Sequence, residues 1–321
     1  MPLISGTPYH HGWLYRNAHA STMIPSTVRR VQAVPYARHR LELPDGDFLD
    51  VDWSVHGNPR VAVLCHGLEG DSGRPYMRGM VQAFRAAGWD AAAMNFRSCS
   101  GEPNRLVRSY HSGATDDLCA VLAHVREKGY REIALVGFSL GGNLVLKYLG
   151  EQPSAVLPEV CAAVTISVPV DLAESTTALV QPRNRIYHGR FMRKLRRKIL
   201  AKAALLPGKL DASPLKRVGN IIEFDDLFTA PLHGFRDAAD YYARSSAQNW
   251  LEDIAVPTLL LSARNDPFLG PRCFPRQAAT ASSHFYLQET PWGVHVGFHR
   301  RGGTYYSEDR AVAFVKEFAR G

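Results

Sequence analysis

Short apolar runs alternate along this chain with segments in which apolar residues recur every three or four positions. The first pattern predicts buried strands, and the second predicts helices with one buried face. The expected strands cover residues 61–65, 133–136, 163–168, 257–262 and 284–287, and the expected helices cover residues 76–87, 115–128, 237–246 and 307–318. Strands that alternate with helices predict an α/β fold with a mostly parallel central sheet and helices on both faces.

Two stretches depart from this alternation. Residues 38–55 contain two amphipathic segments around the turn at 44–47, which predicts an antiparallel hairpin at the start of the sheet. Residues 171–236 lie between an expected strand and an expected helix and are long enough to form a helical insertion. We therefore predict one catalytic domain, formed by residues 1–170 and 237–321, with residues 171–236 as an inserted cap.

A serine lies in a glycine-rich turn between an expected strand and an expected helix. The string is Gly137-Phe138-Ser139-Leu140-Gly141, preceded by the apolar run 133–136 and followed by the helical pattern 142–149. A G-x-S-x-G string arises often by chance, but this strand-before, helix-after context is typical of a nucleophile elbow. We therefore predict that Ser139 is a nucleophile rather than an ordinary turn residue.

A serine hydroxyl needs a histidine to take its proton and a carboxylate to orient that histidine. Asp266 follows the expected strand 257–262, and His295 follows the expected strand 284–287. The predicted triad is therefore Ser139, Asp266 and His295. Asp171, which follows the strand 163–168, remains an alternative carboxylate, and His299 remains an alternative histidine.

Acyl transfer also requires N–H donors aimed at the carbonyl oxygen, which becomes charged during the reaction. We expect one donor at Leu140, directly after the serine. The other is expected at Leu68, because His66-Gly67-Leu68-Glu69-Gly70 follows the early strand 61–65 and its glycines allow a close turn. His66 is interpreted as a structural residue of this loop.

Several further strings carry a family resemblance in combination. They are Gly12-Trp13-Leu14, Asn17-Ala18-His19, residues 66–70, Asn95-Phe96-Arg97-Ser98-Cys99-Ser100-Gly101-Glu102-Pro103-Asn104, Tyr110-His111-Ser112-Gly113, residues 137–143, Phe224-Asp225-Asp226, Pro231-Leu232-His233-Gly234-Phe235, Asn265-Asp266-Pro267 and residues 293–298. Together they resemble the YheT-like branch of the α/β-hydrolases, serine hydrolases related to eukaryotic membrane-anchored abhydrolase-domain proteins.

This resemblance spans nearly the whole chain. It implies an α/β-hydrolase fold, a Ser139–Asp266–His295 triad, and hydrolysis of carboxylic esters with small or medium acyl groups. Ser98 departs from the family pattern, which usually has glycine after the arginine, so the backbone of this loop is the part that the resemblance leaves undefined.

Charge is concentrated in the proposed cap. The chain has a net charge of +8, and residues 183–202 contain no acid. The basic residues of this segment are Arg183, Arg185, Arg190, Arg193, Lys194, Arg196, Arg197, Lys198 and Lys202. Apolar residues recur every four positions within it, which predicts an amphipathic cap helix with a solvated basic outer face. A seat on an anionic membrane surface is the main alternative use of that face.

Other features exclude several classes of function. No metal-binding His or Cys spacing and no phosphate-binding P-loop occurs, so we predict no cofactor and no metal, and the lack of aromatic platforms argues against nucleic acid. His10, His11 and His19 are interpreted as packing or surface residues.

No apolar stretch of about 18 residues or signal peptide is apparent, and five scattered cysteines suit a reducing compartment, so we expect a cytoplasmic protein.

The sequence therefore predicts a serine carboxylic-ester hydrolase that acts on a small-molecule ester or lipid. A membrane-surface acylglycerol lipase or phospholipase is the first alternative. A non-catalytic scaffold with the same fold is the second.

Overall fold

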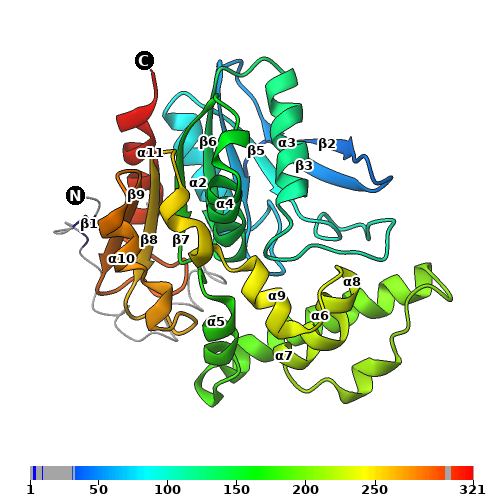
Figure 1. Cartoon of the computed structure of the whole chain (residues 1–321). Coiled ribbons are helices and arrows are strands. Elements are labelled where there is room, and N and C mark those ends of the chain that lie inside the picture. The colour runs from blue at the N-terminus through cyan, green and yellow to red at the C-terminus, as the bar shows by residue number, and fades with distance from the viewer. Residues whose placement is uncertain (1–2, 5–8, 10–30, 32, 301–304, 321) are drawn as a thin grey trace.

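The computed structural model describes residues 3–4, 9, 31, 33–300 and 305–320. In this part of the chain, nine strands form one sheet (Figure 1). In sheet order they are β1 (Leu3–Ile4), β9 (Phe285–Thr290), β8 (Thr258–Ala263), β7 (Val160–Ile166), β6 (Glu132–Phe138), β4 (Arg60–Cys65), β5 (Asp90–Asn95), β3 (Phe48–Ser54) and β2 (Ala37–Glu42). The strings at residues 12–14 and 17–19 and the histidines at 10 and 11 lie outside the described residues.

The sheet is mostly parallel, as the sequence predicts. Neighbouring strands pair in parallel along the run β1, β9, β8, β7, β6, β4 and β5. The strand β3, in contrast, pairs antiparallel with both β5 and β2. The hairpin β2–β3 is therefore present at one edge, where it was expected. The short strand β1 on the opposite edge was not predicted, because two residues are too few to show a periodic pattern.

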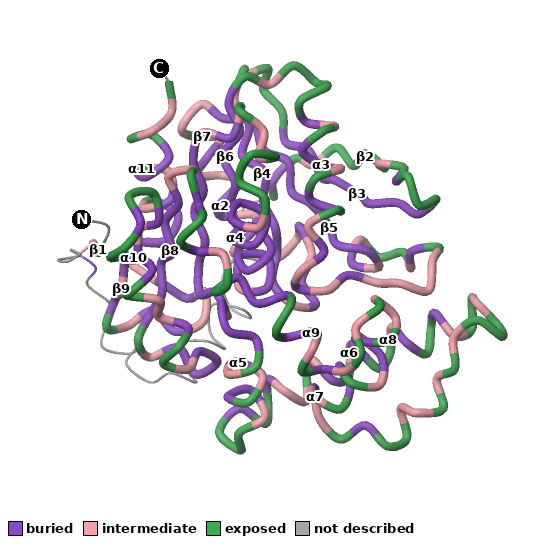
Figure 2. Tube along the Cα trace, viewed as in Figure 1, coloured by how far each residue is buried: buried purple, intermediate pink, exposed green. Residues whose placement is uncertain are grey.

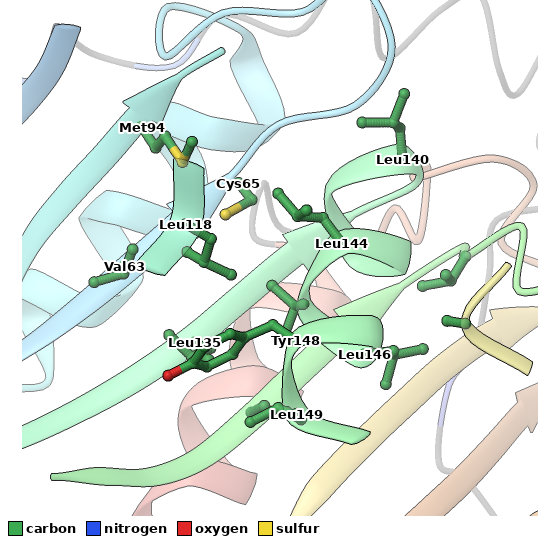
Figure 3. Packing of buried hydrophobic residues seen from close by; sticks show 14 of the residues in the cluster. Val63, Cys65, Met94, Leu118, Leu135, Leu140, Leu144, Leu146, Tyr148 and Leu149 are labelled. Atoms are coloured by element: carbon green, nitrogen blue, oxygen red, sulfur yellow. The ribbon is translucent and has the colours of Figure 1, made fainter. Parts of the chain in front are cut away.

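Helices cover both faces of the sheet. One face carries α2 (Pro75–Ala86) and α11 (Tyr306–Phe318), and the other carries α3 (Thr115–Glu127), α4 (Leu140–Glu151) and α10 (Arg276–Ala281). Figure 2 shows the central strands as continuously buried trace between these layers. Figure 3 shows Leu144, Tyr148 and Leu149 of α4 in the same buried cluster as Leu135 of β6. Burial on both sides explains why these strands are continuous apolar runs.

The hairpin strand β3 differs from its predicted amphipathic character, because all seven of its residues are buried. Its polar side chains are paired instead of solvated. Arg38 donates two hydrogen bonds to Asp52, at 2.7 and 2.8 Å, and Arg40 donates two to Asp50, at 2.9 and 3.0 Å. Such paired contacts compensate the desolvation of the aspartates.

The loop that contains Ser98 is also defined. Ser98 has a φ of 62°, in the left-handed region that glycine adopts most readily. Its hydroxyl lies 2.5 Å from Asn104 Oδ1, and the Asn104 N–H donates back to it at 3.0 Å. These hydrogen bonds stabilise the conformation that serine adopts here without glycine.

The segment proposed as a cap is helical. In Figure 1 it lies below the central strands of the sheet. It contains α5 (Leu172–Leu179), α6 (Arg185–Leu205), α7 (Ile221–Phe224) and α8 (Ala230–Leu232), and α9 (Ala238–Ser245) follows. No helix among the described residues combines the length and the apolar character needed to cross a membrane.

The basic helix α6 is amphipathic, but its charges are not all on a solvated face as predicted. Lys194, Lys198 and Lys202 lie four residues apart and point toward the loops that follow β4 and β5. Lys198 Nζ lies 2.8 Å from Glu69 Oε1, and Lys194 Nζ donates to the Glu69 carbonyl oxygen at 2.8 Å. Lys202 is 1 % exposed and donates to the carbonyl oxygens of Val107 and Arg108 at 2.9 and 2.5 Å.

The buried lysine has an altered ionisation. Burial lowers the pKa of Lys202 to about 7, and the nearby charge of Asp47 offsets this only in part. The sequence could not reveal these inward lysines, because their partners lie more than ninety residues away in the chain.

Candidate active site

The elbow residue Ser139 lies between β6 and α4 with φ 51° and ψ −119°. This is a strained conformation for a residue with a side chain, and such strain concentrates at functional sites. The Ser139 N–H donates to the Ile166 carbonyl oxygen of β7 at 2.9 Å, and the Ser139 carbonyl oxygen accepts from Gly142 at 2.9 Å as α4 begins. These bonds hold the serine at the corner between strand and helix.

Two glycines allow this corner to be so tight. A methyl group on Gly137 would lie 2.5 Å from the Gly141 carbonyl oxygen, and a methyl group on Gly141 would overlap the Cys65 carbonyl oxygen of β4. Real Cβ atoms do not approach backbone so closely, so helix α4 can only contact the sheet here through glycine.

The structure brings the three predicted side chains together. Ser139 Oγ lies 3.0 Å from His295 Nε2, and His295 Nδ1 lies 2.8 Å from Asp266 Oδ2. The Asp266 side chain is fully buried and the His295 side chain is 14 % exposed. A buried carboxylate at Nδ1 favours the tautomer whose free Nε2 can accept the serine proton.

The histidine loop is fixed on both sides of His295. The Val294 N–H donates to Asn265 Oδ1 at 3.0 Å, and the Val296 N–H donates to Ser167 Oγ at 3.1 Å. Sequence reasoning did not identify Ser167 as a site residue. Its position directly after β7, in a parallel sheet whose neighbouring strands end at Ser139 and Asp266, is a signal that could have found it.

The two alternative residues have other contacts. Asp171 Oδ1 accepts from the Glu174 N–H at 2.9 Å as the N-cap of α5, and Asp171 Oδ2 lies 3.0 Å from Arg272. The His299 ring packs edge-on against Tyr305 with 5.5 Å between ring centroids. Neither residue is bonded to Ser139 or to His295 within the described chain.

The expected oxyanion donors belong to the loop after β4 and to the start of α4. Three N–H groups of that loop are occupied: Gly67 by the Tyr76 hydroxyl at 3.0 Å, Glu69 by the Tyr110 hydroxyl at 3.0 Å, and Gly70 by the Gly67 carbonyl oxygen at 2.9 Å. The N–H groups of Leu68 and Leu140 have no hydrogen-bond partner among the described residues. Both residues line a pocket beside Ser139, so these two groups are available to an oxyanion.

His66 is a structural part of the same loop. It is fully buried, its Nδ1 lies 2.8 Å from the Gly67 carbonyl oxygen, and its Nε2 accepts from the Phe96 N–H at 3.2 Å. Burial lowers the pKa of His66 to about 3, so the ring is neutral and does not compete with His295 as a base.

Two pockets meet at Ser139 and His295. The first, here called the apolar pocket, extends between the sheet and the cap. Its apolar lining is Leu68, Leu140, Leu172, Leu179, Phe191, Leu195, Ile199, Ile221, Phe224, Phe228, Leu232, Phe268 and Leu269. The cap helices supply most of these side chains, and such a lining suits a hydrocarbon chain.

Asp225 is an acidic residue in the apolar pocket. It accepts hydrogen bonds from the Thr229 hydroxyl at 2.6 Å and the Tyr242 hydroxyl at 2.7 Å. Burial raises the pKa of Asp225 to about 6, and the two hydroxyls offset this only in part. Asp225 is therefore largely uncharged at mildly acidic pH.

We expect Asp225→Asn to change how stability depends on pH. The pKa of Asp225 is higher in the folded than in the unfolded protein. The stabilisation that this group contributes to the wild type is therefore complete below about pH 4 and is lost as the pH rises through about 6. Wild type should lose about 1–2 kcal/mol from this group between about pH 5 and about pH 8, whereas the amide loses none. Urea unfolding of both proteins at the two pH values measures this, and a constant difference between them would contradict it.

No group of three or more His, Cys, Asp or Glu residues could hold a metal ion, as far as residues 33–300, 305–320 and the short described N-terminal stretches are concerned.

Comparisons with known proteins identify the family and the fold of this chain. The model of the alpha/beta hydrolase fold family matches residues 61–296. "Putative esterase YheT" of Escherichia coli K12 is 42 % identical over 90 % of this chain and 86 % of its own length. "Phospholipase ABHD3" of Mus musculus is 27 % identical over 92 % of this chain and 74 % of its own. "Monoacylglycerol lipase" of Saccharomyces cerevisiae is 28 % identical over 88 % of this chain and 63 % of its own.

Solved structures share the fold at lower sequence identity. Pyrococcus furiosus esterase Pf2001 has a TM-score of 0.61 and 16 % identity, covering 90 % of this chain and 96 % of its own. The fold and the family resemblance that the sequence predicts are thereby confirmed.

Proposed function

Because this chain belongs to the α/β hydrolase fold family and is esterase-like, we propose that it is a serine carboxylic-ester hydrolase. The substrates we propose are esters with small to medium acyl groups. The observation that carries the proposal is the pair of contacts at His295, 3.0 Å to Ser139 Oγ and 2.8 Å to Asp266 Oδ2, at the edge of the apolar pocket.

The proposed reaction begins when Ser139 Oγ attacks the ester carbonyl while His295 Nε2 takes its proton. Asp266 holds the ring and stabilises the imidazolium. The N–H groups of Leu68 and Leu140 donate to the tetrahedral oxyanion. His295 then gives its proton to the leaving alcohol, and water hydrolyses the acyl-enzyme by the same steps in reverse.

A fluorophosphonate probe tests this proposal directly. It forms a covalent bond with an activated serine, so peptide mapping of the labelled protein should locate the label on Ser139. A chain that binds ligand without catalysis would remain unlabelled. An acyl-chain series of p-nitrophenyl esters, measured with and without detergent micelles, then defines how long a chain the apolar pocket accepts.

A second candidate function, a lipase at a membrane surface, is favoured by the outer face of α6. Ile186 and Leu200 are 55 % and 57 % exposed and lie on the same helical face as Arg193 and Arg197. Residues 183–210 contain no acid. Exposed apolar side chains among cations fit a surface of anionic lipid.

We expect the double substitution Arg193→Glu and Arg197→Glu to weaken binding to phosphatidylglycerol vesicles by about 30-fold or more, since each cation contributes about 1 kcal/mol at such a surface. Vesicle co-sedimentation measures this. Hydrolysis of dissolved p-nitrophenyl butyrate should not change, because neither arginine lines a pocket at Ser139.

The exposed Arg131, which precedes β6, provides the control substitution Arg131→Glu. Equal binding of wild type to neutral and anionic vesicles, or equal loss in the control, would contradict this second candidate.

A further inference from the structure

The second pocket at Ser139, here called the basic pocket, has a different character from the apolar pocket. Both contain Ser139 and His295, but three cations line the basic pocket: Arg74, Arg190 and Lys194. Arg74 begins α2, and the other two belong to α6 of the cap. Cations from two separate parts of the chain therefore meet beside the candidate nucleophile.

Two of these cations share one neutral acceptor. Arg74 Nη2 donates to the Glu69 carbonyl oxygen at 3.1 Å, and Lys194 Nζ donates to the same oxygen at 2.8 Å. Burial, followed by the neighbouring charge of Arg74, lowers the pKa of Lys194. Two like charges at one carbonyl repel each other, and an anion between them would relieve that repulsion.

The acids nearby compensate this cluster only in part. Glu69 is the acid that lines the basic pocket, and its carboxylate is bonded to Lys198 at 2.8 Å and to the Tyr110 hydroxyl at 2.8 Å. Asp71 lies 3.1 Å from Arg74 but does not line the pocket. Arg190 has no ion pair in the described part of the chain, so its charge is available.

The two pockets separate the two halves of an ester. The hydrocarbon-like lining of the apolar pocket suits the acyl chain, which leaves the basic pocket for the alcohol. We propose that the alcohol half of the substrate carries an anionic group, a phosphate or a carboxylate, which Arg74, Arg190 and Lys194 bind. This inference rests on the proposed esterase function. When the ester C–O bond breaks, His295 protonates the leaving oxygen and an anionic alcohol departs.

The chemistry of the cations supports this assignment. Guanidinium groups bind phosphate and carboxylate in bidentate fashion, and hydrogen bonds to charged partners are about twice as strong as neutral ones. A neutral alcohol would leave Arg190 and Lys194 without an ion-pair partner among the described residues, so binding of an anion is favoured over binding of its neutral analogue.

The test compares three octanoyl esters that differ on the alcohol side: 1-octanoyl-glycerol, 1-octanoyl-glycerol 3-phosphate and the octanoyl ester of glycolate. All are used below the concentration at which micelles form. We expect kcat/KM of wild type for at least one anionic ester to exceed that for the neutral ester by about 10-fold or more, and the preference to fall as salt is added. The anionic ester with the higher kcat/KM shows whether the site prefers a phosphate or a carboxylate.

Two single substitutions locate the preference. Arg190→Gln and Lys194→Met should each lower the ratio of anionic to neutral kcat/KM by about 5-fold. Arg190→Gln should affect the neutral ester little, whereas Lys194→Met also removes the hydrogen bond to the Glu69 carbonyl oxygen and should lower kcat/KM for all three esters by a common further factor. Arg217→Gln removes an exposed cap arginine that does not line the basic pocket and should leave the ratio unchanged.

The outcomes separate the two proposals. If wild type hydrolyses the neutral ester as fast as both anionic esters, or if the two substitutions reduce all substrates equally, the anion site is wrong while the esterase stands. If no ester is hydrolysed, or if hydrolysis persists after Ser139→Ala, the esterase proposal itself fails.

Discussion

Replacing Ser139 with alanine is expected to lower kcat for p-nitrophenyl butyrate by about 10⁴- to 10⁶-fold. The substitution removes the Oγ atom that lies 3.0 Å from His295 Nε2, and with it the covalent acyl-enzyme. Alanine adds no atom and keeps the elbow glycines in place, so stability should change by less than about 1 kcal/mol. Steady-state kinetics and thermal unfolding of the same preparation measure both quantities.

The exposed Ser213 of the proposed cap provides a matched control, because Ser213→Ala also removes one hydroxyl but lies outside both pockets at Ser139. It should retain wild-type kcat and wild-type labelling by a fluorophosphonate. A Ser139→Ala protein that is folded and keeps more than about a tenth of the activity would show that another residue attacks the ester.

The substitution Asp266→Asn is expected to lower kcat by about 10⁴-fold. Asp266 Oδ2 accepts from His295 Nδ1 at 2.8 Å, and Asp266 Oδ1 accepts from the Phe268 N–H at 2.9 Å. Because Oδ1 has to remain an acceptor, the amide NH₂ of asparagine would face Nδ1. That contact places the ring proton on Nε2, where it blocks abstraction of the serine proton.

Asp171→Asn is the matched control for this substitution. Asp171 also follows a parallel strand, but its Oδ1 caps α5, and asparagine caps helices about as well as aspartate. We expect near wild-type kcat and a stability change of about 1 kcal/mol or less. If Asp171→Asn lost more activity than Asp266→Asn, the carboxylate would have been assigned to the wrong strand.

Local pattern was enough to predict the elbow and the strands around it. The five expected strands all occur, with ends shifted by a few residues, because each is an apolar run buried on both faces. The order of Ser139, Asp266 and His295, which follow β6, β8 and β9, could also be predicted, since parallel strands finish at one edge of a sheet.

The burial and pairing of charged side chains could not be predicted from local pattern, because the partners are distant in the sequence. The polar residues of β3 look solvent-exposed from their alternation, yet Asp50 and Asp52 are buried because Arg38 and Arg40 of the neighbouring strand neutralise them. Lys198 appears to be one more surface cation of α6, yet it is paired with Glu69. Helical periodicity gives the angular position of a charge but not the identity of the group that faces it.

The lysines of α6 connect the proposed cap to the main chain at Glu69, Val107 and Arg108. Glu69 directly follows Leu68, one of the proposed oxyanion donors. An outward movement of α6 would therefore break the hydrogen bond from Lys194 to the Glu69 carbonyl oxygen. Under the proposed mechanism, a movement of α6 that enlarges the apolar pocket would therefore also loosen the loop that holds the Leu68 N–H.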